Sequence, residues 1–400
     1  MIVELHLLQS FPTSNLNRDD VGQPKSVTFG GVTRARISSQ CLKRSARRLF
    51  PHFGLAENET GMRTKRLLLA TARLLEGRTE GEPEQETRDL VREALHTLGF
   101  SIAEKERTEY LFFLGRKAAE HLADYCRDNR DALAEAAAAR RAAEEKAEKE
   151  GKKARTKEAK VRPDAKAAEV ARRVLSADRA VDIALFGRMM ADNRDFNVDA
   201  ASQVAHALST HAVATEFDYY TAVDDLKQME ADEDAGADMI GVVDFNAACY
   251  YRYANVDLEQ LERNLDLRGA DDDLVRRAVG AWLKAFVRAT PSGKQNSMAA
   301  RTQPEALLGV VREHGAWNLA NAFLSPVEGT DIMGESKKRM LRHFTELNGF
   351  YGDPGGDGGE IKAVVGGAPS GPLPHLEPGQ TAATLHEFTD RILDAALGRR

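Results

Sequence analysis

Six basic residues are concentrated between Val32 and Arg48, and no acidic residue lies among them. The set consists of Arg34, Arg36, Lys43, Arg44, Arg47 and Arg48. A guanidinium group can form paired hydrogen bonds with phosphate oxygens, and an ammonium group acts as a point charge. Because these donors extend along more than one helical turn, they favour a nucleic-acid backbone over a single small phosphate. A solvated charged face is the competing interpretation.

Paired carboxylates could hold Mg²⁺ for phosphodiester chemistry, and the chain has two such pairs, Asp19–Asp20 and Asp224–Asp225. Neither pair has a His, a Lys or a third carboxylate at a suitable spacing, so turn or cap roles are favoured. His206 and His211 are five residues apart and would not share a helix face as an i,i+4 metal pair does. No nucleophile motif is present. We therefore predict no catalytic residue, no metal site and no cofactor.

Tyrosines form a concentrated group in a chain with only 6% aromatic residues. The group consists of Tyr219, Tyr220, Tyr250, Tyr251 and Tyr253. Packing in the core or within a hairpin is the favoured role for most of them. Aromatic rings on an extended arm could also stack on nucleic-acid bases, which tolerates any base sequence.

The basic residues require a positioning helix, and the sequence predicts one that starts at Ser38 or Ser39, either of which could cap it. Leu42, Ala46 and Leu49 recur at helical spacing as a buried stripe, which leaves the basic residues on the remaining surface. Ser38, Ser39 and Gln40 would place neutral donors beside a helix N-terminus, where phosphate binds readily.

The segments before this helix are predicted as a strand and a long loop. Residues 2–9 alternate as a half-buried strand, with Glu4 and His6 on the face opposite the apolar residues. Residues 10–31 are rich in Pro, Asn and Gly and are expected to form a loop.

Beyond the basic helix, residues 58 to about 180 are expected to be helical throughout. Within them, an Ala-, Glu-, Lys- and Arg-rich stretch is expected to be a solvated helix pair or a mobile segment, broken near Gly151 and Pro163. Residues 181–190 have strand-like patterning and 198–211 helical patterning. Two β-rich segments flanking an acidic run near 225–238 predict a projecting hairpin. Helices are expected at 271–290, 335–349 and 382–398.

The charge distribution is asymmetric along the chain. The net charge is −6, yet residues 1–50 carry eight basic and three acidic residues, which leaves −11 on the other 350. This asymmetry argues for a confined anionic ligand and against indiscriminate polyanion binding. The three cysteines are far apart, no stretch has transmembrane length, and the N-terminus lacks signal-peptide patterning. We expect a cytoplasmic protein without a membrane partner.

Several ordered blocks of this sequence resemble one known family. They are LNRDD, FGG, RISSQCLKRSARR, DIALFGRM, AHALSTHAV, YYTAVDDL and YYRYANVDL, followed by weaker similarity in PSGKQNSMAA and LANAF. Together they resemble the CasC family, the backbone subunit of the type I-E CRISPR surveillance complex Cascade.

The resemblance implies an α+β fold shaped like a hand. A modified RRM (ferredoxin-like) palm would comprise residues 1–57, 181–211 and 247–400. An inserted helical fingers domain would occupy 58–180, and a thumb hairpin 212–246. The Ala- and Lys-rich stretch is longer than is usual in the family, so DNA-handling roles of family fingers are not carried over to it.

The resemblance also implies which residues contact RNA. Arg18, Lys25, Ser38, Gln40, Lys43 and Arg47 match palm residues that hold the RNA backbone, and the basic run adds Arg44. Met189 matches the apolar residue packed against bases near a kink. The thumb positions that wedge at a displaced nucleotide correspond to Tyr219, Tyr220, Thr221 and Val223.

The expected function is that of a non-catalytic subunit that assembles head to tail along CRISPR RNA. Its expected partners are that RNA, other copies of itself, other Cascade subunits, and the target DNA strand by way of the guide. Two alternatives remain open from the residues. One is a metal-dependent ribonuclease that uses Asp19 and Asp20, and the other is a general single-strand RNA-binding protein.

Overall fold

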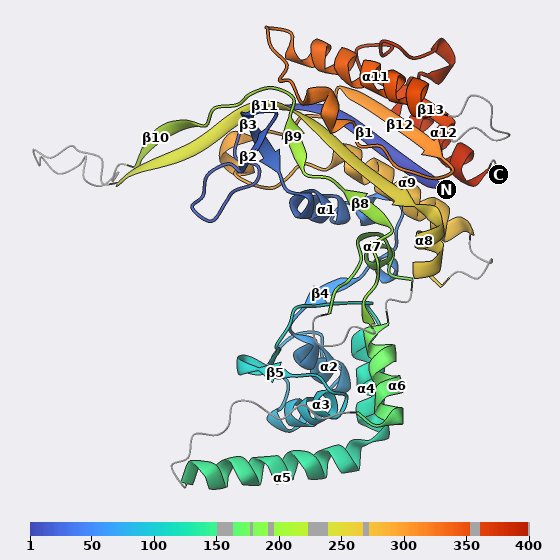
Figure 1. Ribbon diagram of the computed structural model, residues 1–400. Helices are drawn as coiled ribbons and strands as arrows, with labels where there is room; N and C mark the ends of the chain where they lie inside the picture. The colour runs from blue at the N-terminus through green and yellow to red at the C-terminus, as the bar shows by residue number, and fades with distance from the viewer. Residues whose placement is uncertain are drawn as a thin grey trace, which may run out of the picture. The chain divides into compact units, whose positions relative to one another are not determined.

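The computed structural model describes residues 1–149, 163–176, 179–190, 196–222, 239–266, 272–352 and 361–398 (Figure 1). The chain forms two compact units. Unit 1 contains Met1–Leu55, Ser202–Glu259 and Asp271–Arg400, and unit 2 contains Ala56–Ala201 and Gln260–Ala270. Residues 181–201, expected in the palm, thus pack with unit 2. The assignment of palm, fingers and thumb itself stays a prediction.

Unit 1 is built on a large antiparallel sheet with the strand order β13-β12-β1-β11-β9-β3-β2, and β8 and β10 also pair with β11. Its described strands are β1 (Ile2–Ser14), β2 (Ser26–Phe29), β3 (Val32–Ile37), β8 (Ser202–Val204), β9 (Ala207–Ser209), β10 (Glu216–Ala222), β11 (Met239–Asp257), β12 (Ala306–Arg312) and β13 (Ile361–Gly367). The long strand β11 pairs with β1 over most of its C-terminal half and with β10 over its N-terminal part.

Helices cover both faces of the central strands. The helical segments of unit 1 are α1 (Ser39–Arg47), η1 (Phe50–Phe53), α9 (Asp272–Arg288), α10 (Gln295–Met298), η6 (Leu319–Phe323), α11 (Ile332–Tyr351), η7 (Pro378–Gln380) and α12 (Leu385–Leu397), while α8 (Leu258–Asn264) begins in unit 1 and ends in unit 2. The three helices expected in the C-terminal half are confirmed as α9, α11 and α12.

The expectation that β1 has one solvated face is wrong. Glu4 and His6 are buried, because η6 and α11 cover the face on which they lie. The Glu4 carboxylate pairs with the Arg312 guanidinium at 2.7 Å and accepts a hydrogen bond from the Tyr253 hydroxyl at 2.9 Å. The His6 ring is within 2.9 Å of the Tyr251 hydroxyl. These partners come from β11 and β12, so β1 itself contains no local signal for the burial. β1 also extends to Ser14, into the segment expected to be a loop.

Unit 2 contains a helical cluster with short strands. Its described elements are η2 (Glu57–Glu59), β4 (Met62–Thr64), α2 (Leu67–Leu75), α3 (Gln85–Thr97), β5 (Ile102–Ala103), η3 (Glu104–Glu106), β6 (Arg107–Thr108), β7 (Phe112–Leu114), α4 (Ala118–Asp128), α5 (Arg130–Lys149), α6 (Ala165–Leu175) and α7 (Val181–Phe186). The strand pairs β4–β7 and β5–β6 correct the expectation of helix throughout. The Ala-, Glu-, Lys- and Arg-rich stretch contains the helices α5 and α6, and residues 150–162 between them lie outside the described residues.

Two predictions between residues 181 and 211 are wrong. Val181–Phe186 forms the helix α7, in which all six side chains are buried, and a short apolar run of this kind has no periodicity that separates helix from strand. Residues 202–209 form β8 and β9 instead of a helix, because β11 supplies hydrogen-bonding partners to both. Tertiary pairing overrides the local preference there.

Candidate nucleic-acid interface

The arginines of the basic run have different roles, and Arg34 belongs to the core. It is fully buried and donates hydrogen bonds to the carbonyls of Phe29 (3.2 Å), Ser209 (3.1 Å) and Phe323 (2.8 Å). Burial lowers the pKa of the Arg34 guanidinium. The turn between β2 and β3 packs so closely on Leu324 that a side chain at Gly30 would overlap the Leu324 carbonyl oxygen. Arg34 therefore joins β3 to β9 and η6 and is not available to a ligand.

The helix α1 and its C-cap Arg48 carry most of the accessible cations of the run, and Arg36 on β3 is half-buried. Ser38 is its N-cap, and its side-chain oxygen accepts a hydrogen bond from the Cys41 backbone N–H at 3.3 Å, which confirms the predicted cap. The buried stripe consists of Leu42 and Ala46, whereas Leu49, which was also expected in it, is half-buried and follows the end of the helix. The polar and basic positions lie off this stripe: Gln40 and Arg44 are exposed, and Lys43 and Arg47 are half-buried.

The loop that precedes β2 is tied to the start of α1. The Asn17 side chain accepts a hydrogen bond from the Ser38 backbone N–H at 2.8 Å, and the Asn17 carbonyl accepts one from the Lys25 backbone N–H at 2.9 Å. Arg18 is exposed and forms a β-bridge with Pro24. The loop thus holds Arg18 and Lys25 beside the N-terminal end of α1. We call residues 15–25 together with 38–48 the loop–helix surface.

Asp19 has a turn role. Its side-chain oxygen accepts hydrogen bonds from the backbone N–H groups of Val21 (3.0 Å) and Gln23 (2.9 Å). Within the described ranges, no group of three or more His, Cys, Asp or Glu residues could hold a metal ion. Asp224–Asp225 lie outside those ranges.

Two residues that sequence reasoning did not select for this surface also shape it. Asn15 donates hydrogen bonds to the carbonyls of Gly22 (3.0 Å) and Asp244 (2.9 Å) and so joins the loop to β11. His206 lies 3.1 Å from the Arg36 guanidinium, and its pKa is lowered by desolvation and then by the charges of Arg36 and Lys25. An Asn in a turn-rich loop was the only local signal for Asn15.

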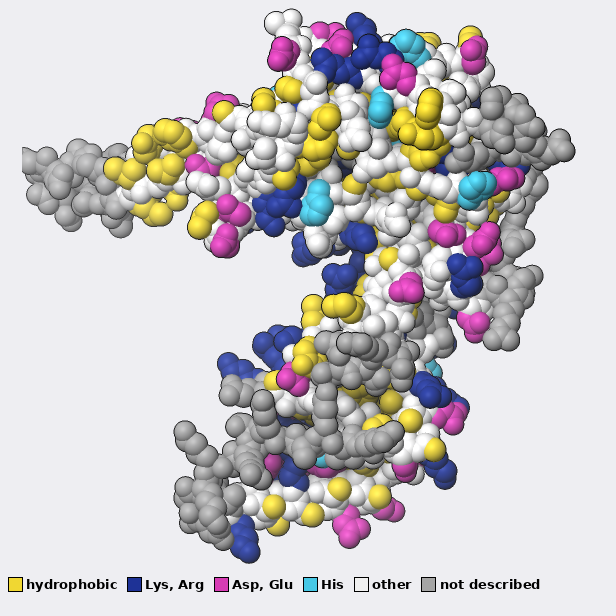
Figure 2. Space-filling model, in the orientation of Figure 1, with side chains coloured by type: hydrophobic (Ala, Val, Ile, Leu, Met, Phe, Trp, Pro, Cys, Tyr) yellow, Lys and Arg dark blue, Asp and Glu magenta, His cyan; other side chains and the backbone are white. Residues whose placement is uncertain are grey.

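The predicted hairpin is formed by β10 and β11, and it presents aromatic side chains to solvent (Figure 2). Tyr219 is 65% exposed and Tyr220 46%, while Thr221 is also exposed. Tyr220 lies over Gly241, where a Cβ would collide with its ring. Val223 and the acidic tip lie outside the described residues.

The hairpin also exposes apolar side chains on the face that carries Tyr219. The register places Tyr219 opposite Val242 and Thr221 opposite Ile240, and Phe217 contacts Tyr219 edge to face at 5.9 Å between ring centroids. An exposed apolar group of this size on a projecting arm indicates a binding surface. The other tyrosines of the group, Tyr250, Tyr251 and Tyr253, are buried in the sheet, as favoured for most of them.

Met189, the remaining site residue, lies in unit 2 and is 86% exposed. The preceding Arg188 donates hydrogen bonds to the carbonyls of Leu175 (2.7 Å), Phe113 (3.1 Å) and Phe196 (2.9 Å). Burial lowers the pKa of Arg188 to about 10, so it remains charged at neutral pH. These contacts fix the backbone from which Met189 projects.

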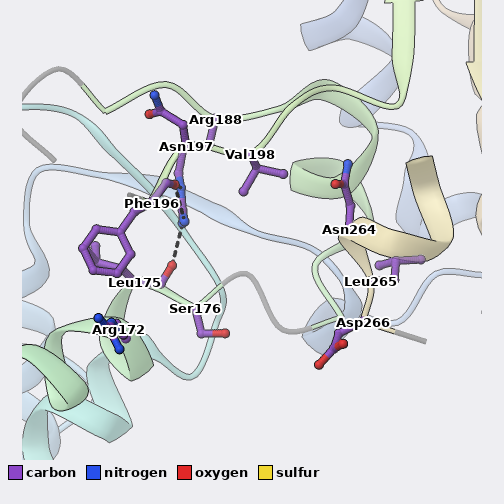
Figure 3. Close-up of a pocket in the computed structure, with 10 residues that line it drawn as sticks. All are labelled: Arg172, Leu175, Ser176, Arg188, Phe196, Asn197, Val198, Asn264, Leu265 and Asp266. Carbon is purple, nitrogen blue, oxygen red and sulfur yellow. Dashed lines mark hydrogen bonds between the residues drawn. The ribbon is translucent and has the colours of Figure 1, made fainter. Parts of the chain in front are cut away.

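Arg188 also lines a pocket of about 320 Å³ within unit 2 (Figure 3). The lining residues are Arg172, Leu175, Ser176, Arg188, Phe196, Asn197, Val198, Asn264, Leu265 and Asp266. The Arg188 guanidinium is already bound to carbonyl groups, so its role in this pocket is structural.

The structure brings the basic site residues together in unit 1. The loop–helix surface contains seven of the predicted site residues: Arg18 and Lys25 on the loop, and Ser38, Gln40, Lys43, Arg44 and Arg47 at the helix. Figure 2 shows Lys and Arg side chains gathered where β2, β3 and α1 lie. Helices cover both faces of the central sheet, so bases cannot lie flat on those strands. In the described part of the chain, no helix is long and apolar enough to cross a membrane.

The fold is that of subunits from CRISPR surveillance complexes. A chain of a solved complex described as "CRISPR RNA-guided surveillance complex, pre-nicking" has a TM-score of 0.80 and 28% sequence identity, covering 99% of this chain and 100% of that one. A chain of another, "CRISPR RNA-guided surveillance complex", has a TM-score of 0.67 and 25% identity with the same coverage.

A family model described as CT1975-like protein (Cas_CT1975) matches residues 3–387, and the chain therefore belongs to this family. No curated protein matches the chain. These findings confirm the resemblance to the CasC family and the α+β fold with a large antiparallel sheet.

Proposed function

We propose that this protein is a non-catalytic CRISPR RNA-binding subunit that assembles head to tail along the guide RNA of a type I-E Cascade complex. The observation that carries the proposal is the loop–helix surface. Lys25 and the cap of α1 are joined through Asn17, and Lys43, Arg44 and Arg47 lie off the buried stripe of the helix. Such a set binds phosphates without reading bases, as expected when base pairing reads the sequence.

The hairpin supports the second part of the proposal, which is assembly on the strand. Tyr219 and Tyr220 on its exposed faces would wedge at a displaced nucleotide bound by another copy. Met189 in unit 2 would pack against a neighbouring base. A head-to-tail contact is heterologous and does not close on itself, so the RNA would set the number of copies. Other Cascade subunits and the target DNA strand, paired with the guide, complete the proposed partners in the cytoplasm.

The direct test is to purify the full chain from cells that contain a CRISPR array, extract the bound nucleic acid and sequence it. Repeat–spacer RNA is expected. Unrelated RNA bound in proportion to its abundance would instead identify a general single-strand RNA-binding protein.

A second measurement separates binding from cleavage. The assembled complex is incubated with Mg²⁺ and a complementary RNA, which should remain intact because the Asp19 carboxylate is bound by two backbone N–H groups. Cleavage at regular intervals that disappears in Asp19→Asn would overturn the non-catalytic assignment.

A further inference from the structure

A second stretch without acidic residues runs from Arg288 to Gln303, far from the loop–helix surface in sequence. It contains three cations, Arg288, Lys294 and Arg301, together with several short polar side chains. Like the basic run from Val32 to Arg48, it carries cations without acidic neighbours.

The fold places this stretch against the loop–helix surface. A Cβ at Gly293 would lie only 2.5 Å from the carbonyl oxygens of both Asn15 and Leu16. Backbone therefore lies directly on backbone at the start of the loop that carries Arg18 and Lys25. The same Asn15 side chain holds that loop through the Gly22 carbonyl.

The stretch from Ser292 to Arg301 is held in a defined shape. Lys294 and Ala299 have left-handed backbone conformations, with φ of 49° and 47°, on either side of the one-turn helix α10. Left-handed residues other than Gly are strained and are concentrated at functional sites. Beyond the stretch, the Thr302 hydroxyl donates to the Ser10 carbonyl at 2.6 Å, and the Gln9 amide donates to the Thr302 carbonyl at 2.9 Å.

Several polar side chains of this turn are directed to solvent, whereas the Gln295 amide donates a hydrogen bond to the Pro291 carbonyl at 3.1 Å. Asn296, Ser297 and Arg301 are exposed, and Lys294 is half-buried. The buried residue Ala300 and the anchors at Thr302 fix the backbone from which Arg301 projects. A fixed backbone that presents cations and neutral donors suits a phosphate chain, because little side-chain freedom is lost on binding.

We propose that residues 292–301 form a second contact to the RNA backbone, in which Lys294 and Arg301 bind phosphates of the same strand as the loop–helix surface. This inference rests on the proposed function. The ligand class is single-stranded RNA, bound through its phosphates and without base specificity. The close approach at Gly293 sets the two segments side by side in unit 1.

The test measures binding of the full-length protein to a fluorescent single-stranded repeat–spacer RNA over a range of salt concentrations. Each phosphate contact to a single strand contributes about 0.7 to the slope of log affinity against log salt. The double variant K294A/R301A should therefore lose about 1.4 from that slope and about 25-fold in affinity at 0.1 M salt. The control K338A/R342A removes the same two charge types from exposed positions of α11 and should bind as the parent does.

Two further variants separate the possible outcomes. Lys43→Ala tests the loop–helix surface in the same assay. If K294A/R301A binds RNA normally while Lys43→Ala weakens binding, the second contact is wrong and the proposed function stands. If both variants bind normally, the proposed function fails. Gly293→Ala changes no charge but forces the turn off Asn15 and Leu16, so it should also weaken binding; unchanged binding would contradict joint binding of one strand by the two segments.

Discussion

At the scale of single residues, two arginines of one short run have opposite roles. Arg34 is buried among backbone carbonyls, whereas Arg47 lies on α1 off the buried stripe. The sequence between them contains no acidic residue, so charge alone does not separate them. The difference arises because Arg34 lies on the strand β3, where η6 supplies a carbonyl acceptor, and Arg47 lies at the end of α1.

The accessible cations should control RNA binding without affecting the fold. We expect the variant Lys43→Glu with Arg47→Glu to lose RNA-dependent assembly, because two phosphate contacts become repulsions. Leu42 and Ala46 remain buried, so the monomer should stay folded. Circular dichroism and sedimentation with and without RNA would check both parts. A variant that still assembles on RNA would contradict the assignment of this surface.

Substitution of the buried Arg34 should instead lower the stability of the fold. Arg34→Met leaves the carbonyls of Ser209 and Phe323 without their donor in a buried site. We expect a loss of roughly 1–3 kcal/mol in the free energy of unfolding, the usual cost of unsatisfied buried groups. Urea denaturation measures it, with the exposed Arg44→Met as the matched control. Equal stability of the two variants would show that the three carbonyl contacts contribute nothing.

At the scale of elements, the hairpin of β10 and β11 has its base in the sheet and its outer part in solvent. Its base is fixed by pairing of β11 with β1, and Tyr250 and Tyr251 are buried there. Its outer part exposes Phe217, Tyr219 and Ile240, which no described neighbour covers. Because its base is paired in the sheet and its outer part is exposed, the hairpin is suited to contact another molecule.

The exposed aromatic side chain of the hairpin should stabilise assembly on RNA. Tyr219→Ala is expected to weaken RNA-dependent assembly by about 1–3 kcal/mol, the usual contribution of one base–aromatic stack. The matched control is Tyr351→Ala on α11, because Tyr351 and Tyr219 are both 65% exposed. Native mass spectrometry with RNAs of increasing length would measure the copies bound. If both variants assemble equally well, the hairpin does not stack on the strand.

At the scale of the whole molecule, unit 1 is centred on a buried polar network that joins three strands. Glu4 and His6 on β1 contact Arg312 on β12 and Tyr251 and Tyr253 on β11. Desolvation raises the pKa of Glu4, whereas desolvation and the Arg312 charge lower the pKa of His6 to about 3. The network makes the stability of the fold depend on pH.

The contribution of His6 has a defined sign. Its pKa is lower in the folded state than the ordinary 6.5, so the unfolded chain binds the proton more tightly, and stability falls as the pH drops below about 6.5. Between pH 7 and pH 5 the loss from His6 is about 2 kcal/mol. The raised pKa of Glu4 acts in the opposite direction, so the difference between the parent and His6→Gln isolates the histidine. Denaturation curves at pH 7 and pH 5 measure the free energy of unfolding of both proteins. An equal loss of stability in the parent and in His6→Gln would contradict this account.

The sequence by itself determined the features that depend on neighbouring residues. The cap at Ser38, the stripe of Leu42 and Ala46, the hairpin and the family resemblance all follow from patterns within short segments. Only the tertiary structure decided that Glu4, His6 and Arg34 are buried, that 181–186 is a helix, and that 202–209 pairs with β11. The reason is physical: burial and strand pairing depend on segments outside the local sequence, such as β11 for residues 202–209 and β12 for Glu4, and no local pattern contains them.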